Sequence, residues 1–342
     1  MIDLKLLEKL CLAPGVSGDE ENVRDIILSE IKDYADKIEI DNLGNIIAFK
    51  KGKNKSSKKL MINAHMDEVG LIATYITDEG YIKFSAVGGI DKKILLGKKV
   101  FIGKERVPGV IGVKPIHLLE SNERLKSVKI DNLYIDIGAK NKDEALKYAV
   151  PGDYICFDSS FKLNGNIVMS KALDDRIGCL VLIDLIKKDL PFDVYFSFVV
   201  QEEIGLRGST VASYKINPDS AIVVETTTAA DIHGNDDKVC SINEGAVVPF
   251  MDKATVYNRE YFKLAFSLAK KYKIKIQTKT AISGGNDAGS IHMSREGVKT
   301  IAVSTPCRYL HSFFTLASID DIESTENLVF RLIENIFKNK IW

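Results

Sequence analysis

The sequence predicts an α/β protein with a mostly parallel central sheet, helices on both faces of that sheet, and an inserted small β-barrel domain. Two observations carry this prediction. Strand-like and helix-like segments alternate in residues 1–69 and again in residues 170–342, as in sheets whose strands are joined by helical crossovers. Residues 70–169 instead hold short strand-like runs separated by glycines and turns. We therefore expect a discontinuous main domain, 1–69 and 170–342, that carries an inserted domain, 70–169.

The bulk composition is that of an ordinary globular protein. The 342 residues are 45% hydrophobic and 27% charged, and 47 basic residues balance 47 acidic ones. Such a balance creates no global field for nucleic acid or an anionic membrane, so we expect neither partner. Apolar windows are too short to span a bilayer, the N-terminus lacks a signal-peptide layout, and the five scattered cysteines form no CxxC pair. We expect a cytoplasmic protein with reduced thiols.

The first part of the chain predicts helices followed by strands. A helix over residues 4–12 is stopped by Pro14 and Gly15. Ser17 with Glu20 predicts a capping box for the next helix, whose apolar residues keep helical spacing. Strands are then predicted at residues 37–40, 45–50 and 59–64.

The insert and the second part of the main domain follow. The strand-like runs of the insert are GLIATYI, GYIKFSAV, KKVFI, GVIGVK, NLYIDIGA, DYICFD and GNIVMS, with a short helix over 142–149. Alternation then resumes with a buried helix that begins near Arg176, and a glycine-rich turn over 284–297 leads into another helix. Ser318 and Asp321 stand at capping positions of the last helix. The remaining predicted elements are strands 194–200, 220–224, 275–278 and 300–304 and helices 258–272 and 319–338.

Histidines and carboxylates recur where the predicted strands end. These candidates are His65, Glu202, Glu203, Glu225 and His311, together with Asp174 and Asp175 at the mouth of a helix. Because ligands of open α/β sheets collect outside the carboxyl ends of strands, the side chains would converge in one crevice. Two histidines and several carboxylates suffice for two divalent ions with one bridging carboxylate. This pattern is typical of a two-metal hydrolase.

Each candidate alone has a simpler interpretation. A single histidine after a strand is usually a loop or core residue, and paired aspartates before a helix often only complement its dipole. The hypothesis therefore depends on their joint placement. His117, His233 and His292 are interpreted as structural or loop residues.

Five sequence stretches carry a resemblance to a known family. AHMDEVG (64–70), KALDDRIG (171–178), EEIGLRG (202–208), SGGNDAG (283–289) and PCRYLHS (306–312) resemble the signature stretches of the tetrahedral, or TET, aminopeptidases. These are cocatalytic dinuclear metallopeptidases that include glutamyl and deblocking aminopeptidases, and some relatives have carried an endoglucanase label. The stretches occur in the family's order over nearly the whole chain. The family often has Asp where this chain has Glu225, and Thr where it has Asn286.

The resemblance implies a set of metal ligands. His65 and Glu225 would bind one divalent ion, and His311 and Glu203 the other. Asp174 would bridge the two. The ions would be zinc or cobalt, with manganese as a further option, because His and carboxylate ligands suit all three.

The resemblance also implies roles for the residues beside these ligands. Glu202 would be the general base and Asp67 would hold the ring of His65. Asp175 would follow Asp174 across a peptide bond that is often cis in this clan, and which of the two bridges stays open. Adjacent residues of an extended backbone point in different directions, so Glu203 can ligate while Glu202 turns toward a water.

The function implied is a metal-dependent aminopeptidase that removes N-terminal residues from short peptides. In the family the insert drives dimerisation, and dimers build a tetrahedral shell of twelve subunits. Three alternatives remain open: a glycoside hydrolase that uses two carboxylates, a non-catalytic peptide-binding homologue, and a deacylase or dipeptidase with the same metals. The preferred N-terminal residue also stays open; an acidic preference would need a cation such as Arg308 or a lysine.

Overall fold

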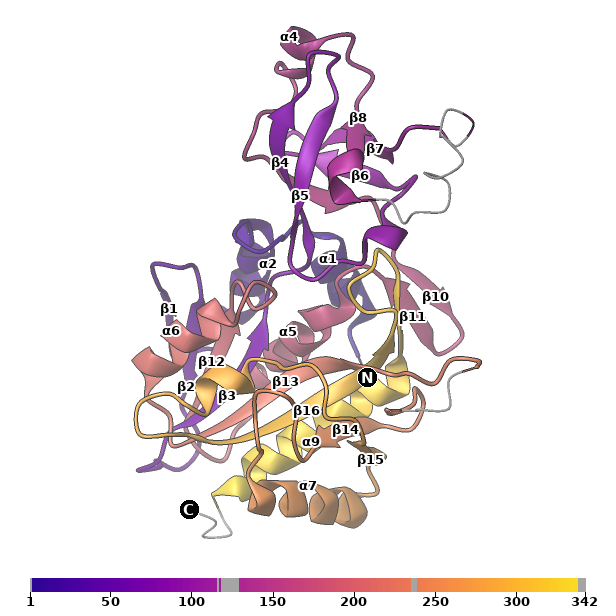
Figure 1. Cartoon of the computed structure of the whole chain (residues 1–342). Coiled ribbons are helices and arrows are strands. Elements are labelled where there is room, and N and C mark those ends of the chain that lie inside the picture. The colour runs from indigo at the N-terminus through magenta and orange to yellow at the C-terminus, as the bar shows by residue number, and fades with distance from the viewer. Residues whose placement is uncertain (1, 116, 118–128, 235–238, 338–342) are drawn as a thin grey trace.

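The computed structural model describes residues 2–115, 117, 129–234 and 239–337. It consists of a large mixed sheet with helices packed on it and a separate barrel above the sheet (Figure 1). The predicted fold class is therefore confirmed. The described part of the chain contains no helix that is long and apolar enough to cross a membrane.

The main sheet has eleven strands and a parallel centre. Its nine-strand path runs in the order β1 (Lys37–Ile40), β2 (Ile46–Lys50), β12 (Val194–Val199), β3 (Leu60–His65), β13 (Ser220–Thr228), β16 (Lys299–Arg308), β17 (Thr315–Ser318), β11 (Ile167–Ser170) and β10 (Lys162–Asn164). Strands β12, β3, β13 and β16 are parallel to one another. β14 (Ala246–Pro249) pairs antiparallel with β16, and β15 (Ile276–Lys279) pairs parallel with β14. The carboxyl ends of the four central strands therefore share one edge.

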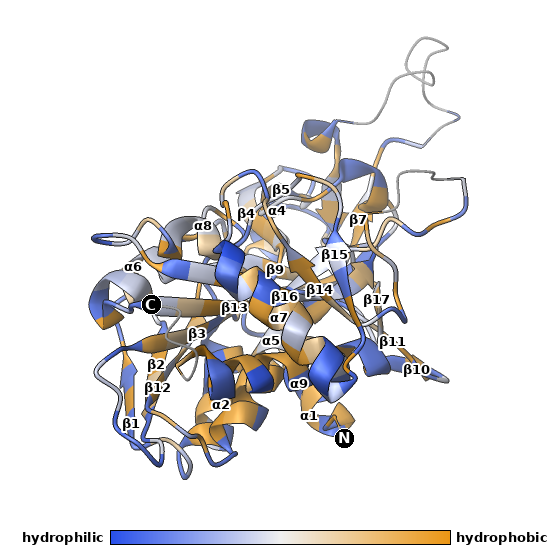
Figure 2. Ribbon diagram, turned by 90° about the horizontal axis from the view of Figure 1, so that it is seen from below, coloured by the Kyte–Doolittle hydropathy of each residue, from blue (hydrophilic) through white to orange (hydrophobic). Residues whose placement is uncertain are grey.

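Successive residues along the strands point to opposite faces of the sheet, and each face has an apolar core. Helices pack on both faces and complete these cores. One core contains α1 (Leu4–Leu12), α2 (Glu21–Ile31), α5 (Leu173–Ile186), α7 (Arg259–Tyr272) and α9 (Ile319–Ile336). The other contains α6 (Arg207–Ile216) and α8 (Ala288–Ile291). On β3, Ile62 belongs to the first core and Met61 to the second. Figure 2 shows hydrophobic and hydrophilic colours together on α7 and α9, as expected of helices with one face in solvent.

The insert forms a closed antiparallel barrel with its own apolar core. Its strands, in the order in which they pair, are β4 (Gly70–Ile76), β5 (Ile82–Val87), β8 (Tyr134–Asp136), β7 (Val107–Gly112), β6 (Lys99–Ile102) and β9 (Tyr154–Phe157). In the described part of the insert, short helices accompany them: η1 (Lys92–Ile94), η3 (Ile130–Asn132) and α4 (Lys142–Ala145). Closure removes the free strand edges that would otherwise invite pairing with other chains.

Two local predictions were wrong. Ser17 does not cap α2, because its hydroxyl donates to Asp67, and the N-cap residue Glu20 makes no side-chain cap bond. The strand 167–170, which we expected in the insert, is β11 of the large sheet and pairs antiparallel with β17. Its partner lies far along the chain, so a local pattern of short strands could not assign it.

Other differences concern element ends. β13 continues to Thr228 and β16 to Arg308, so Glu225 lies inside a strand and not after one. At the last helix, Ser318 makes no side-chain cap bond, and the carboxylate of Asp321 accepts hydrogen bonds from the backbone of Asn243 and Gly245. The sequence prediction also lacked β10, α6, β14 and β17.

The central strand β12 allows a test of this core. Phe196 is fully buried, and replacing it with Ala should lower the free energy of unfolding by about 3–5 kcal/mol, because lost burial and a cavity both destabilise. Val256 is 72% exposed, so Val256→Ala should change it by no more than about 0.5 kcal/mol. Urea unfolding followed by circular dichroism measures both. Equal losses in the two variants would contradict the assignment of Phe196 to the core.

Candidate metal centre

The predicted site residues meet at the carboxyl edge of the central strands. His65 ends β3, Glu225 lies in β13, and Asp174 lies in the first turn of α5. Glu202 and Glu203 follow β12, and His311 follows β16. All six line one cavity of about 180 Å³, which also includes residues of β14, β15 and the 284–286 turn. Segments far apart in sequence are thus brought to one crevice, as the strand order requires.

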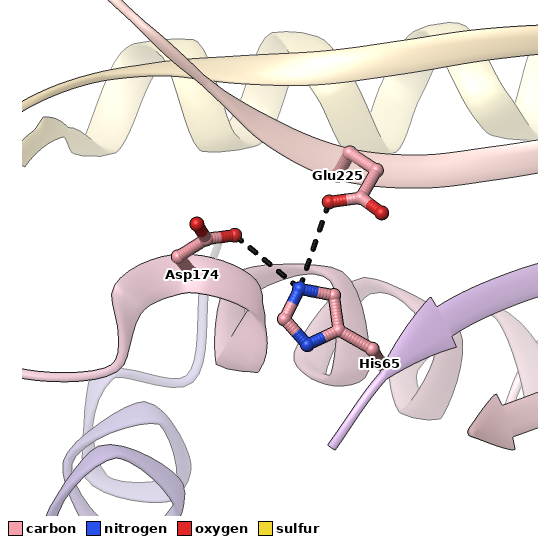
Figure 3. A group of neighbouring side chains, drawn as sticks. All are labelled: His65, Asp174 and Glu225. Carbon is pink, nitrogen blue, oxygen red and sulfur yellow. Dashed lines mark ion pairs between the residues drawn. The ribbon is translucent and has the colours of Figure 1, made fainter. Parts of the chain in front are cut away.

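The first group of ligands is centred on His65. Its Nε2 atom lies 3.4 Å from Oδ1 of Asp174 and 3.8 Å from Oε2 of Glu225 (Figure 3). The side chains of His65 and Glu225 are almost entirely buried, at 1% and 4% exposure. The second oxygen of Glu225, Oε1, is buried without a hydrogen-bond partner. A buried carboxylate oxygen with no donor is costly, so this position calls for a cation.

The second group is centred on His311. Its Nε2 atom lies 3.2 Å from Oε2 of Glu203 and 3.5 Å from Oδ2 of Asp174. Its other ring nitrogen, Nδ1, lies 2.8 Å from the carbonyl oxygen of Gly89, which belongs to the loop after β5 of the barrel. That carbonyl accepts a hydrogen bond only from a protonated Nδ1, which leaves Nε2 free to bind a metal.

Asp174 belongs to both groups, whereas Asp175 belongs to neither. The two carboxylate oxygens of Asp174 face different histidines, His65 and His311. Those of Asp175 accept backbone hydrogen bonds, from His65 at 3.3 Å and from Gly178 at 3.0 Å. The peptide bond between the two aspartates is cis. Of this adjacent pair, only Asp174 has the placement of a bridging ligand.

The donor atoms fit two divalent cations. Each group offers one imidazole nitrogen and two carboxylate oxygens, all within 4.8 Å of one another. Ligands held ~2.1 Å from a tetrahedral zinc ion lie about 3.4 Å apart, close to the 3.2–3.8 Å separations of the donor atoms around the two histidines. Nitrogen and oxygen donors of this kind suit zinc, cobalt and manganese, and do not select among them.

Burial and crowding shift the pKa values of these groups. Burial, followed by the charge of Asp174, raises the pKa of Glu203 to about 8. The carboxylate of Asp174 raises the pKa of His311 to about 9. Burial opposes protonation of His65, but Asp174 and Asp67 outweigh it and hold its pKa well above the ordinary value. A cation that binds here displaces protons, as is general for sites of deprotonated ligands.

Asp67 connects His65 to the turn that carries the paired glutamates. Its carboxylate accepts hydrogen bonds from the hydroxyl of Ser17 at 2.6 Å and from the backbone N–H groups of Glu202 at 2.9 Å and Glu203 at 3.1 Å. Its Oδ1 also lies 3.4 Å from Nδ1 of His65, whose Nε2 faces the first group of ligands. These donors outweigh burial and lower the pKa of Asp67. One buried carboxylate therefore holds both the first histidine and the turn that carries the paired glutamates.

Some residues at the site were not singled out from the sequence. Ser17 and Gly89 act through contacts that no local pattern reveals. Asp287 was present only as a letter of the SGGNDAG stretch; it is fully buried, its Oδ2 accepts a hydrogen bond from Asn63 at 2.7 Å, and its Oδ1 has no partner. Asn286 accepts a hydrogen bond from the backbone of Ala288.

The other histidines lie away from the two groups. His117 and His233 are exposed, as expected for loop residues. His292 follows α8, and its Nδ1 lies 2.8 Å from the carbonyl oxygen of Ala288. A deeper ion pair supports the first turn of α5: Lys171 donates to Oε1 of Glu68 at 2.5 Å, and both side chains are buried.

Comparison with known proteins adds independent information. The family model described as M42 glutamyl aminopeptidase matches residues 44–328. The chain is 35% identical over 345 residues to the lysyl aminopeptidase of Pyrococcus furiosus, a match that covers 98% of each protein.

Solved structures agree over nearly the whole chain. A TET aminopeptidase from a marine sediment archaeon of the Thaumarchaeota has a TM-score of 0.94 and 34% identity, over 97% of this chain and 96% of that one. The TET1 peptidase of Pyrococcus horikoshii, described as assembling into a tetrahedron or a large octahedral shell, has a TM-score of 0.86 and 36% identity, over 97% and 99%. A Thermotoga maritima structure described as an endoglucanase has a TM-score of 0.80 and 38% identity, over 96% of both chains.

The central position of Asp67 can be tested through stability. Asp67→Ala leaves three buried donors without an acceptor, so the free energy of unfolding should fall by at least about 2 kcal/mol. Ser17→Ala removes one donor and leaves the others in place, and should cost about 1 kcal/mol. Urea unfolding of both variants after metal removal measures the difference. A loss in Asp67→Ala no larger than in Ser17→Ala would contradict the connecting role.

Proposed function

The chain belongs to the M42 glutamyl aminopeptidase family, which confirms the resemblance to TET aminopeptidases, and on that premise we propose a dinuclear metalloaminopeptidase that removes N-terminal residues from short peptides. The observation that carries the two-metal proposal is Asp174, whose two oxygens face His65 and His311 separately. A carboxylate between two histidine groups is the arrangement of a bridging ligand. Members of this family depend on metal ions, and the donor groups fit that property.

The five proposed ligands are His65, Asp174, Glu203, Glu225 and His311. Two divalent ions held there, zinc or cobalt in the first place and manganese as an alternative, would lower the pKa of a water molecule and polarise the scissile carbonyl. Glu225 replaces the shorter aspartate that relatives often carry. Its Oε2 reaches the imidazole of His65, and the free Oε1 leaves room for coordination.

Glu202 is proposed as the general base. It would accept the proton of the attacking water and return it to the leaving amine. Its side chain lines the same cavity as the ligands, and its backbone N–H is fixed by Asp67. Burial raises the pKa of Glu202 well above its ordinary value, the direction expected of a carboxylate that takes up a proton and later gives it back. Asp67 would position His65 and this turn without touching the substrate.

The size of the cavity supports action at a chain end. Its volume of about 180 Å³ is below the roughly 300–1,000 Å³ of pockets that enclose drug-sized ligands. Such a cavity suits the first residue of a peptide better than an internal segment. The assignment to aminopeptidases by family membership agrees with this reading.

We also propose that residues 70–169 drive dimerisation and that dimers form a twelve-subunit tetrahedral shell. The TET1 peptidase of Pyrococcus horikoshii assembles into a tetrahedron, and the barrel here exposes Tyr75, Val110, Tyr148 and Val150 at 44–56%. Exposed apolar side chains on one small domain favour association. A cytoplasmic location is proposed because all five cysteines are free and buried, as expected for a reducing compartment.

A glycoside hydrolase is the alternative that one neighbour's description raises. Two carboxylates suffice for that chemistry, which needs neither paired histidines nor a shared aspartate. The His65 and His311 groups therefore favour peptide hydrolysis. A deacylase or dipeptidase would use the same ligands and differ only in substrate, and a non-catalytic homologue would not need Glu202 beside an intact ligand set.

Metal removal and a substrate panel test the proposed function. Protein stripped with a chelator should lose cleavage of aminoacyl p-nitroanilides and recover it when zinc, cobalt or manganese is added back. N-acetylated versions of the same substrates should not be cleaved, because an aminopeptidase requires a free α-amine. Cleavage of carboxymethylcellulose that survives chelation would support the glycosidase alternative and contradict ours.

Two substitutions separate metal binding from proton transfer. Glu202→Gln should retain both metals, measured by atomic emission, while kcat falls by about 10²–10⁴-fold, the usual contribution of a general base. His65→Ala should instead lose metal at its own site. Near-normal turnover of Glu202→Gln, or full metal content in His65→Ala, would contradict the roles given to these residues.

A further inference from the structure

We propose that Lys279 makes this protein selective for peptides whose first residue is acidic, an inference that rests on the proposed aminopeptidase function. Family membership does not decide this point, because the matching family model is described as glutamyl and a close relative as a lysyl aminopeptidase. The preference must therefore be read from the cavity of this chain.

Lys279 lies in the wall of the cavity, at the end of a strand that pairs only with β14 among the described strands. It is the last residue of β15 and lies beside Pro249, the last residue of β14. Both residues line the cavity that also holds His65 and Asp174. The ammonium lies against the adjoining turn, since a Cβ added to Gly284 would be 4.0 Å from Nζ.

The ammonium of Lys279 has donors to spare. Its Nζ donates one hydrogen bond, to the carbonyl oxygen of Ser283 at 2.8 Å. Within residues 2–115, 117, 129–234 and 239–337, no carboxylate forms an ion pair with it at 4.0 Å or less, and the charges of Asp252 and Glu225 act on it from farther away. An ammonium carries three N–H donors, so two remain for a ligand. Partial burial lowers the pKa of Lys279, and the charges of Asp252 and Glu225 offset only part of this effect.

The acid in the same wall is already engaged. Oδ1 of Asp252 accepts hydrogen bonds from the backbone of Ala254 at 2.8 Å and Thr255 at 2.7 Å, and Oδ2 accepts the hydroxyl of Tyr257 at 2.6 Å. Asp252 is also 2% exposed, so a substrate side chain has little access to it. In this wall, away from the candidate metal ligands, Lys279 is therefore the charged group that keeps hydrogen-bond donors for a substrate side chain.

The other candidate cation is neutralised elsewhere. Arg308 donates from Nε to Oδ1 of Asp231 at 2.7 Å and from Nη2 to Oδ2 at 2.8 Å. Such a two-point pair satisfies both charges, and Arg308 is not among the residues that line the cavity. The sequence left Arg308 and an unspecified lysine open as the cation, and the structure favours Lys279 over Arg308.

The charge of Lys279 predicts which substrates have the higher kcat/KM. The carboxylate of a first-residue Glu or Asp would accept hydrogen bonds from the free N–H groups of Lys279 and supply a negative charge at ion-pair distance. A Gln residue has the same shape without the charge. Because charge-assisted hydrogen bonds are about twice as strong as neutral ones, kcat/KM should be roughly 10- to 100-fold higher for Glu than for Gln.

The test compares glutamyl, glutaminyl, alanyl, leucyl and lysyl p-nitroanilides on the metal-loaded, full-length protein. Lys279→Met should reduce the Glu-to-Gln ratio of kcat/KM to about one, and Lys279→Arg should retain most of it. Lys275→Met is the matched control, because Lys275 is exposed outside the cavity and donates only to a backbone carbonyl. Arg308→Gln should also leave the ratio unchanged.

Each outcome bears on a different claim. Metal-dependent cleavage of alanyl or leucyl substrates with equal rates for Glu and Gln would overturn the role of Lys279 and leave the aminopeptidase function intact. A preference for Glu that survives in Lys279→Met would also overturn it. Failure to cleave any member of the panel with metal present would instead overturn the proposed function.

Discussion

The structure depends on one electrostatic constraint: carboxylates gather at a partly buried edge where few positive groups meet them. Asp174, Glu203 and Glu225 converge on two imidazoles, and Oε1 of Glu225 has no donor at all. Like charges at such distances oppose one another strongly once water is excluded. In the proposed metal centre, divalent cations would relieve this opposition, so the crowding of carboxylates would contribute to metal affinity.

The surrounding fold keeps the charges in place against this repulsion. Parallel strands deliver His65 and Glu225 from the sheet, where His65 is paired with Val199 of β12 and Glu225 with Ser304 of β16. The remaining groups stand on turns, and polar contacts tie these turns to the fold. Asp67 holds the backbone of the paired glutamates, and backbone N–H groups hold Asp175 away from both ligand groups. Rigid strands and tied turns together make a preorganised site.

The sequence predicted the strands, which depend on local pattern, and the candidate site, which depends on the joint placement of residues at strand ends. Buried strand runs and residues at their ends located His65, Glu203 and His311, because parallel strands share a carboxyl edge. It did not predict Ser17 as a partner of Asp67, since a capping motif and a distant acceptor compete for one hydroxyl and only the fold decides. Nor could spacing separate Arg308 from Lys279, which differ only in whether a counter-ion lies beside them.

The hydrogen bond between His311 and Gly89 bears on how such an enzyme can be re-engineered. The barrel leaves the main domain just after His65 and Asp67 and returns shortly before Asp174. It also supplies, through a backbone carbonyl, the group that fixes the tautomer of the second histidine. A transplanted barrel, or one trimmed to obtain a smaller enzyme, must therefore preserve a carbonyl at that position. Modular exchange of the insert is restricted by a single backbone oxygen.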